Sequence, residues 1–154
     1  MSLAVYAPLS GALAALGKVP DPVFAAQMVG SGLAVEPSPD TGPVEVVAPV
    51  TGVVVKLHPH AFVIRTSSGT GVLVHVGIDT VRLKGECFRT RVAEGEQVEV
   101  GHAVITFDPV AVRAHGLSAI CPVVVLDSQP GSAQPPAVTG LIQAGALMFS
   151  WTAS

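Results

Sequence analysis

The sequence contains few charged and few aromatic residues. Charged residues make up 12% of its 154 residues and aromatic residues 5%, and the eight Lys and Arg are scattered singly, with a formal net charge of −3. A nucleic-acid-binding protein gathers basic side chains on one face to neutralise phosphates. The scattered cations therefore argue against a nucleic-acid-binding protein.

Long apolar runs and cysteine patterns are also missing. No run approaches the roughly 18 residues of a membrane span. Residues 1–17 are rich in Ala and Leu, but they lack the positively charged start of a signal peptide and Pro8 interrupts them. The two cysteines, Cys87 and Cys121, form neither a disulfide framework nor a metal-ligand pattern. We therefore expect a cytoplasmic protein with two free, buried thiols.

What the sequence does contain is short β-branched runs separated by its sixteen glycines and thirteen prolines. Each run has the usual length of a strand, and turn residues recur about every dozen positions. This pattern predicts a single all-β domain over residues 1–154, an antiparallel β-sandwich or barrel. The expected strands lie near 3–7, 32–36, 44–48, 52–57, 61–66, 71–76, 88–92, 103–107, 122–127 and 146–150.

Helix is expected at two places only. An Asp-Pro pair sets a favoured N-cap before a proline at the first helical position, and this pair occurs at Asp21 and at Asp108. The sequence therefore predicts short helical turns near 21–29 and 109–115. Gly116 ends the second of them.

Two sequence echoes indicate a duplicated motif. Ala7-Pro8-Leu9-Ser10-Gly11 matches Ala48-Pro49-Val50-Thr51-Gly52 at an offset of 41 residues. Val98-x-x-Gly101 similarly matches Ile142-x-x-Gly145. We interpret the echoes as two related halves packed about a pseudo-twofold axis.

Three of the five histidines are close in sequence. His58 and His60 precede one predicted strand, His75 lies in the next, and the turn Ser67-Ser68-Gly69 joins the two. Counting outward from this turn places His60 and His75 at opposed positions, where side chains of paired strands meet. A single histidine in an apolar strand is more often a structural residue, but two on one face favour a shared function.

The segment after His75 is the second candidate feature. In Gly77-Ile78-Asp79-Thr80, a glycine would let the backbone of another molecule approach the imidazole, and Asp79 could orient a ring or hold a cation. The ordinary alternative is a turn that closes a strand.

A set of segments spread along the chain occurs in a characteristic order. They are Val19-Pro20-Asp21-Pro22-Val23-Phe24, Ala48-Pro49-Val50-Thr51-Gly52, His60-Ala61-Phe62, His75-Val76-Gly77-Ile78-Asp79-Thr80-Val81, Gly85-Glu86-x-Phe88, Gly95-x-x-Val98, Gly101 and Pro122-Val123-Val124. Together these segments resemble the glucose-family enzyme IIA domain of the bacterial phosphoenolpyruvate-dependent sugar phosphotransferase system, over about residues 5–150. The resemblance implies a β-sandwich with a duplicated motif.

The resemblance also implies a mechanism. His75 would receive a phosphoryl group from the histidine phosphocarrier protein, and His60 would be the second active-site histidine. The acceptor would be the IIB domain of a membrane sugar permease of the glucose, N-acetylglucosamine or β-glucoside type. No cofactor is implied.

A partner-binding face is implied as well. The acidic residues of this face correspond to Asp21 and Asp79, Gly77 lies beside it, and its apolar patch corresponds to Val23, Phe24, Met28 and Val29. Plain core packing is the alternative for Val23 and Phe24, and the exposure of Phe24 distinguishes the two. The family often has a hydroxyl residue where this chain has His58.

Two other classes compete with this interpretation. His58-x-His60 and His75-x-x-x-Asp79 resemble the zinc ligands of lysostaphin-like peptidases, but in that family the two motifs occur in the opposite order. Gly95-x-x-Val98-x-x-Gly101 suggests a biotinyl or lipoyl carrier, but no lysine occupies a suitable hairpin tip. We expect no bound metal, because His58 should turn away and leave two ligands where a catalytic zinc site uses three.

Overall fold

The computed structural model describes residues 2–39, 42–135 and 140–153, which are almost entirely β-strands and turns. The strands are β1 (Ser2–Tyr6), β2 (Gly11–Ala15), β3 (Gly30–Glu36), β4 (Val44–Val47), β5 (Gly52–His58), β6 (Ala61–Arg65), β7 (Gly71–His75), β8 (Phe88–Thr90), β9 (Gln97–Val98), β10 (Ala103–Phe107), β11 (Cys121–Leu126), β12 (Ala133–Gln134), β13 (Leu141–Ile142) and β14 (Leu147–Thr152). The helical turns are η1 (Leu16–Lys18), α1 (Pro22–Ala25), η2 (Thr80–Leu83) and α2 (Pro109–Ala114).

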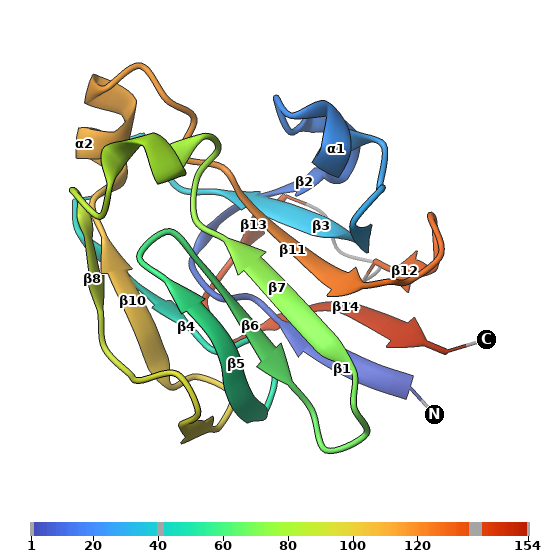
Figure 1. Ribbon diagram of the computed structural model, residues 1–154. Helices are drawn as coiled ribbons and strands as arrows, with labels where there is room; N and C mark the ends of the chain where they lie inside the picture. Colours follow the sequence, from blue (N-terminus) through green and yellow to red (C-terminus); the bar gives the residue numbers. More distant parts are fainter. Residues whose placement is uncertain (1, 40–41, 136–139, 154) are drawn as a thin grey trace.

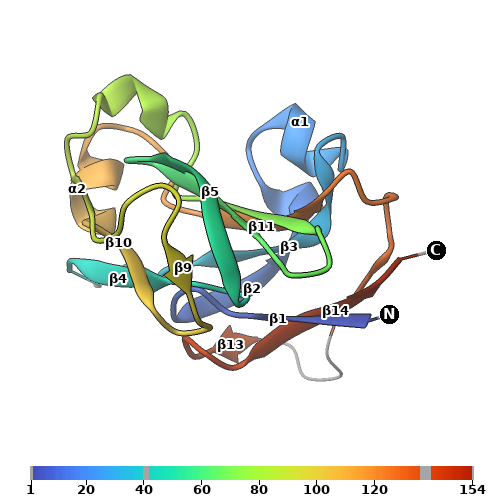
Figure 2. The same ribbon diagram turned by 60° about the horizontal axis from the view of Figure 1, so that its bottom comes forward.

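The strands form a large curled sheet and two small ones. The large sheet has the order β13-β2-β3-β11-β7-β6-β5-β9, and the small sheets have the orders β1-β14-β12 and β4-β10-β8. The pairs with described registers are antiparallel, for example β6 with β7 and β11 with β3. Figures 1 and 2 show the small sheets on one side of the large sheet. This arrangement confirms the predicted antiparallel sandwich.

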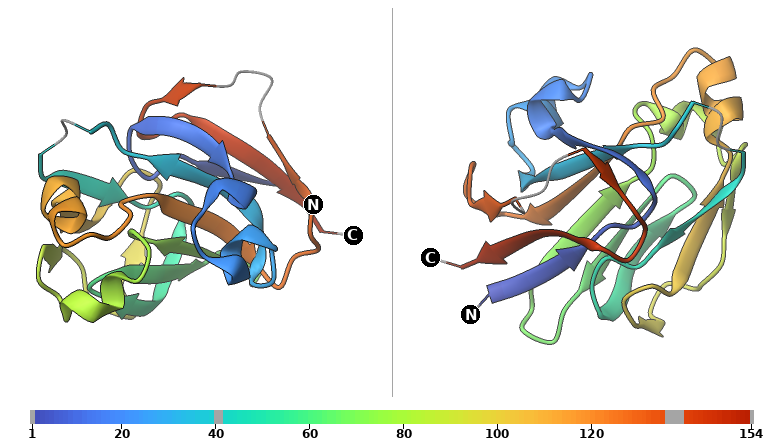
Figure 3. Two further views of the ribbon diagram at one scale, coloured as in Figure 1. Left: turned by 90° about the horizontal axis from the view of Figure 1, so that it is seen from above. Right: turned by 180° about the vertical axis from the view of Figure 1, so that it is seen from behind.

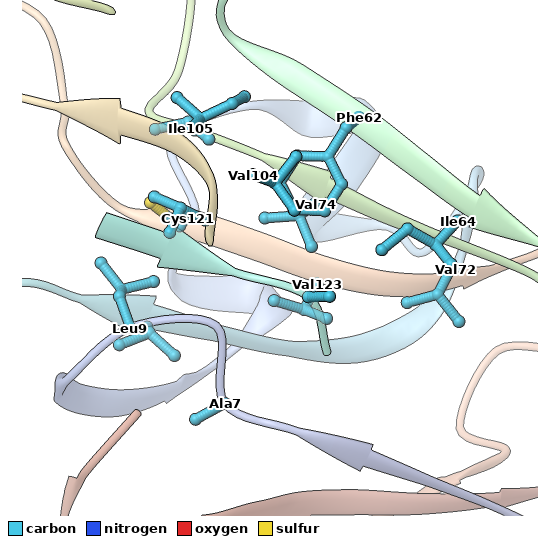
Figure 4. Packing of buried hydrophobic residues seen from close by; sticks show 14 of the residues in the cluster. Ala7, Leu9, Phe62, Ile64, Val72, Val74, Val104, Ile105, Cys121 and Val123 are labelled. Atoms are coloured by element: carbon cyan, nitrogen blue, oxygen red, sulfur yellow. The ribbon is translucent and has the colours of Figure 1, made fainter. Parts of the chain in front are cut away.

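The main core lies between these layers. Alternate residues of a strand point to opposite faces, so Val123 and Val125 of β11 enter the main core with Val72 and Val74 of β7. Figure 4 shows Val72, Val74 and Val123 facing the same interior space. The small sheets contribute apolar side chains from the other side, such as the fully buried Phe149 of β14.

A second, smaller core lies on the other face of the large sheet. Val124 of β11 and Ala34 of β3 point to this side, where Phe24 of α1 and Leu16 of η1 cover them. Figure 3 shows α1 packed over this face, away from β1 and β14. His75 follows Val74 by one position in β7, so its side chain points to this second face.

The two echoed segments contact each other with near-twofold symmetry. The backbone N–H of Tyr6 donates to the carbonyl of Pro49 at 2.9 Å, and the N–H of Val47 donates to the carbonyl of Pro8 at 2.8 Å. Each donor lies 41 positions from its counterpart, as does each acceptor. This reciprocal pair confirms the duplicated motif.

The second echo makes equivalent contacts. The N–H of Gly145 donates to the carbonyl of Ala7 at 2.8 Å, and the N–H of Gly101 donates to the carbonyl of Ala48 at 3.0 Å. The φ angles of these glycines are +87° and +90°, a conformation that favours glycine. The repeated Gly of the echo therefore marks the same turn in both halves.

The predicted elements were found with small differences in their ends. The first predicted helix is shorter, since α1 covers four residues. The strands β2, β9, β12 and β13 and the helical turns η1 and η2 were not predicted. The sequence of β2, Gly-Ala-Leu-Ala-Ala, has no β-branched residue, so propensity gave no signal and pairing with β3 decides its structure. Among the described helices, none is both long and apolar enough to cross a membrane.

Candidate functional site

His75 is the best-defined reactive side chain of the structure. Its Nδ1 lies 2.5 Å from the carbonyl oxygen of Gly77. A carbonyl oxygen can only accept, so Nδ1 carries the proton and Nε2 of the neutral ring keeps its lone pair. The hydrogen bond thus selects one tautomer and makes Nε2 the nucleophilic atom.

The backbone after His75 holds this carbonyl in place. The φ angle of Gly77 is +76°, and the N–H of Ile78 donates to the carbonyl of Ser118 at 3.0 Å. The buried hydroxyl of Thr80 donates to the carbonyl of Val76 at 2.7 Å. Gly77 itself is buried, so it does not open the backbone to another molecule as we expected. Its role here is to aim a carbonyl at His75.

His60 faces His75, although through a different register from the one predicted. The direct partner of His75 is Ala61, while the carbonyl of His60 accepts a hydrogen bond of 2.7 Å from the N–H of Val76. His60 therefore lies in the turn between β5 and β6, where it does not follow strand alternation. The rings of His60 and His75 meet edge to face, with centroids 5.4 Å apart and an interplanar angle of 68°.

His58 was expected to turn away, and the structure corrects this expectation. Its ring stacks on that of His60, with centroids 5.6 Å apart and an interplanar angle of 26°. His58 pairs with Ala61, so only Pro59 and His60 form the turn. This short turn keeps the two imidazoles together. The three rings form a row in which His60 is central.

Phe24 supports the other side of His75. Asp21 caps α1 by accepting hydrogen bonds from the N–H groups of Val23 at 2.9 Å and Phe24 at 3.4 Å. The capped turn places Phe24 edge-on against His75, with centroids 5.3 Å apart. Phe24 is 8% exposed and belongs to the second core. By the exposure criterion stated above, it is a packing residue and not part of an open docking patch.

Other apolar side chains in the segments that carry Phe24 and follow His75 are open to solvent. Val23 is 43% exposed and Met28 is 74% exposed, whereas Val29 is half-buried against the second core. Val81 of η2, which the sequence did not single out as a docking residue, is 59% exposed. We call Val23, Met28 and Val81 the apolar rim. Exposed apolar groups around a reactive residue are typical of a protein-docking surface.

Burial controls the charge of both site histidines. Desolvation lowers the pKa of His75 from its ordinary value of 6.5, and the hydrogen bond to Gly77 and the negative charges of Asp21 and Asp79 oppose this effect. Desolvation also lowers the pKa of His60, with smaller contributions in the same direction from His75 and His58. Both rings therefore stay neutral to a lower pH than free imidazole, and His75 keeps its lone pair available.

Within residues 2–39, 42–135 and 140–153, no three His, Cys, Asp or Glu side chains converge to hold a metal ion. A pocket of about 480 Å³ lies at the far end of the β5–β6 hairpin, where Thr51 and Arg65 line it. His58 is exposed and His60 is half-buried, so the histidine row reaches the protein surface, where a macromolecular partner can contact it.

The two cysteines differ in environment. Cys121 is fully buried, and burial raises the pKa of its thiol to about 12. Cys87 is only half-buried, which differs from the expectation of two buried thiols. Both are free, and neither is part of the histidine row.

The chain is similar to proteins of one family along most of its length. The sequence model of the family described as phosphoenolpyruvate-dependent sugar phosphotransferase system, EIIA 1, matches residues 3–130. A PTS system glucose-specific EIIA component of Halalkalibacterium halodurans is 44% identical over 123 residues, which cover 79% of this chain and 69% of that protein. A PTS system glucosamine-specific EIICBA component of Bacillus subtilis is 43% identical over 119 residues, 76% of this chain and 18% of that protein.

A solved structure agrees with these sequence relatives. The glucose permease IIA from Mycoplasma capricolum has a TM-score of 0.85 and 31% identity to this chain, and the match covers 97% of this chain and 96% of that one. The similarity therefore includes the whole sandwich and the strands that carry the histidine row.

Proposed function

The chain belongs to the EIIA 1 family of the phosphoenolpyruvate-dependent sugar phosphotransferase system, and we therefore propose that His75 is the residue of this protein that carries the phosphoryl group. The protein is a phosphocarrier in sugar uptake, as its family and its glucose-type relatives indicate. The choice of residue rests on one observation, the hydrogen bond between Nδ1 of His75 and the Gly77 carbonyl. It leaves Nε2 unprotonated and ready to attack.

The transfer requires no group beyond the two proteins. The lone pair of Nε2 attacks the phosphorus of a phosphohistidine on the donor, and the P–N bond of the donor breaks with its electron pair staying on the donor nitrogen. His75 keeps its Nδ1 proton, so its ring becomes cationic beside the Gly77 carbonyl, which stabilises that charge. In onward transfer the acceptor takes the phosphoryl group, and the electron pair returns to Nε2.

His60 stabilises the moving phosphoryl group. Its ring lies 5.4 Å from that of His75, centroid to centroid, which allows a ring N–H to reach an oxygen of a phosphoryl group on Nε2. Phosphoryl transfer has a loose transition state, so positioning and charge stabilisation supply most of the catalysis. A placed N–H donor is suited to this purpose.

The partners follow from the family and from the exposed apolar rim. We propose the histidine phosphocarrier protein as donor and the IIB domain of a sugar permease as acceptor; the name of the Bacillus subtilis relative, EIICBA, joins an A component to B and C components. Both partners would dock on the apolar rim, with Asp21 and Asp79 beside it to meet basic groups. We place this exchange in the cytoplasm, where phosphoenolpyruvate is made.

Phosphorylation in vitro tests the assignment. The purified protein, incubated with phosphoenolpyruvate and the two general phosphotransferase proteins, should gain one acid-labile phosphate. His75→Ala should gain none, whereas His102→Ala, which changes an exposed histidine held 3.9 Å from Glu96 and outside the histidine row, should behave like the unchanged protein. Phosphorylation of His75→Ala at the normal rate would refute the assignment.

A further inference from the structure

His58 contacts the site without a role in the steps described above. It is the last residue of β5 and is exposed to solvent, and its ring stacks on His60 with an interplanar angle of 26°. The turn Pro59-His60 fixes the distance between the two side chains, because His58 and Ala61 on either side are paired. The stacking is thus built into the hairpin.

The orientation of His60 needs such a support. Among the described residues, no hydrogen bond is found to a ring nitrogen of His60, in contrast to the bond that His75 makes with Gly77. The last torsion of a histidine side chain is broad, so an unsupported ring samples many orientations. The rings found against that of His60 are His75, edge to face, and His58, stacked. Ring packing therefore sets where the N–H of His60 points.

We propose that His58 is a positioning residue whose ring holds His60 in the orientation that directs an N–H group at a phosphoryl group on His75. This inference rests on the proposed function of His75 and His60. His58 acts through His60 and does not itself contact the phosphoryl group. The requirement is a flat ring at position 58, and not its charge.

Two substitutions at position 58 distinguish the contribution of a stacking ring from the contribution of an ionisable group. His58→Phe keeps a ring that can stack and removes the ionisable nitrogens, whereas His58→Ala removes both. Aromatic contacts of this kind affect equilibria and rates by about threefold to tenfold. We therefore expect onward transfer to a purified IIB domain of a glucose-type permease to slow by about that factor in His58→Ala, and to remain near the original rate in His58→Phe.

The kinetic experiment measures single-turnover transfer from the phosphorylated protein at saturating IIB domain. His102→Ala is the matched control, because it removes an exposed histidine elsewhere. Thermal unfolding of each variant checks that the fold is unchanged, as expected for an exposed side chain. Transfer by His58→Ala at the original rate would overturn the proposal, and so would a His58→Phe variant as slow as His58→Ala.

A second readout does not depend on phosphoryl transfer. Proton NMR of the unphosphorylated protein should show contacts between the ring protons of His58 and His60, and a shift of the His60 ring signals in His58→Ala that is smaller in His58→Phe.

Because the charge of His58 contributes to the lowered pKa of His60, both variants should raise that pKa. If the protein accepted no phosphate, the function of His75 would fail while these signals still tested the stacking. Unchanged His60 signals in His58→Ala would overturn the positioning role.

Discussion

Gly77 and Thr80 are so close that a Cβ atom built on Gly77 would lie 2.6 Å from Cγ2 of Thr80. The same atom would lie 3.0 Å from the carbonyl oxygen of Ser118. Thr80 is held by its buried hydrogen bond to the carbonyl of Val76, so it cannot move aside freely. The carbonyl that orients His75 therefore belongs to a segment without space for a side chain.

The first prediction is that Gly77→Ala destabilises the protein and slows phosphate acceptance together. A left-handed backbone costs an Ala residue about 1–2 kcal/mol, and the contact with Thr80 adds to this cost and displaces the carbonyl. Gly69→Ala is the matched control, since Gly69 has a φ of +90° but open space around it. Denaturant unfolding and acceptance rates measure the effect. Equal losses in both variants would show that the close contact has no consequence.

The second prediction concerns His60→Gln. Gln keeps an N–H donor of similar reach, so His75 should still accept phosphate, while onward transfer slows by up to about a hundredfold because the donor is misplaced. Rapid-quench measurement of the two half-reactions separates these effects. The roles of the two histidines would have to be exchanged if His60→Gln abolished acceptance while His75→Ala retained it.

The third prediction is a loss of stability on acidification. Burial lowers the pKa values of His75 and His60 below 6.5, so the unfolded chain binds more protons than the folded one as the pH falls through that value. The free energy of unfolding should therefore be largest above about pH 7 and decrease toward about pH 5. The double variant His60→Gln/His75→Gln should lose less stability over this range. Identical pH profiles, measured by urea unfolding, would contradict the lowered pKa values.

The sequence predicted the parts of the site that depend on local patterns. The Asp-Pro pair at Asp21 gave the helical turn, and the alternation along β7 placed His75. The register of His60 was wrong by one position, because the strand pairing is centred on Ser68, which places Ala61 opposite His75. The sequence of a turn does not show which of its residues is the centre of the pairing. The Nδ1 hydrogen bond to Gly77 was not predictable either, since it depends on a backbone carbonyl.

Burial was the harder property to predict from sequence. Phe24 and Val23 are adjacent and both apolar, yet Phe24 is 8% exposed and Val23 is 43% exposed, because only one side of a single helical turn faces the sheet. Val81 was missed for a related reason. It follows a strand in an apolar segment, so only the direction of η2 reveals that it is exposed.

The fourth prediction tests the apolar rim. Met28→Ser should raise the KM for both protein partners by about threefold to tenfold and leave kcat and thermal stability nearly unchanged, because 74% of the side chain is exposed and stabilises only a complex. Leu141→Ser is the matched control, since Leu141 is 84% exposed on the edge strand β13. An equal effect of the two substitutions would show that the rim is not the docking surface.

The fifth prediction concerns zinc. His60 and His75 face each other, and Nε2 of His75 is free to bind a metal, but His58 stacks behind His60 and no third ligand converges among the described residues. Two ligands fall short of the three that a catalytic zinc site uses.

Metal analysis of protein purified without added zinc should consequently find well under one equivalent. Added Zn²⁺ should bind weakly and inhibit phosphorylation, because both need Nε2 of His75. His58→Phe, which keeps the ring that stacks on His60 but has no nitrogen to bind a metal, should leave the zinc affinity nearly unchanged, whereas His75→Ala should abolish binding. One tightly held zinc that is lost in His58→Phe would show that His58 is a ligand.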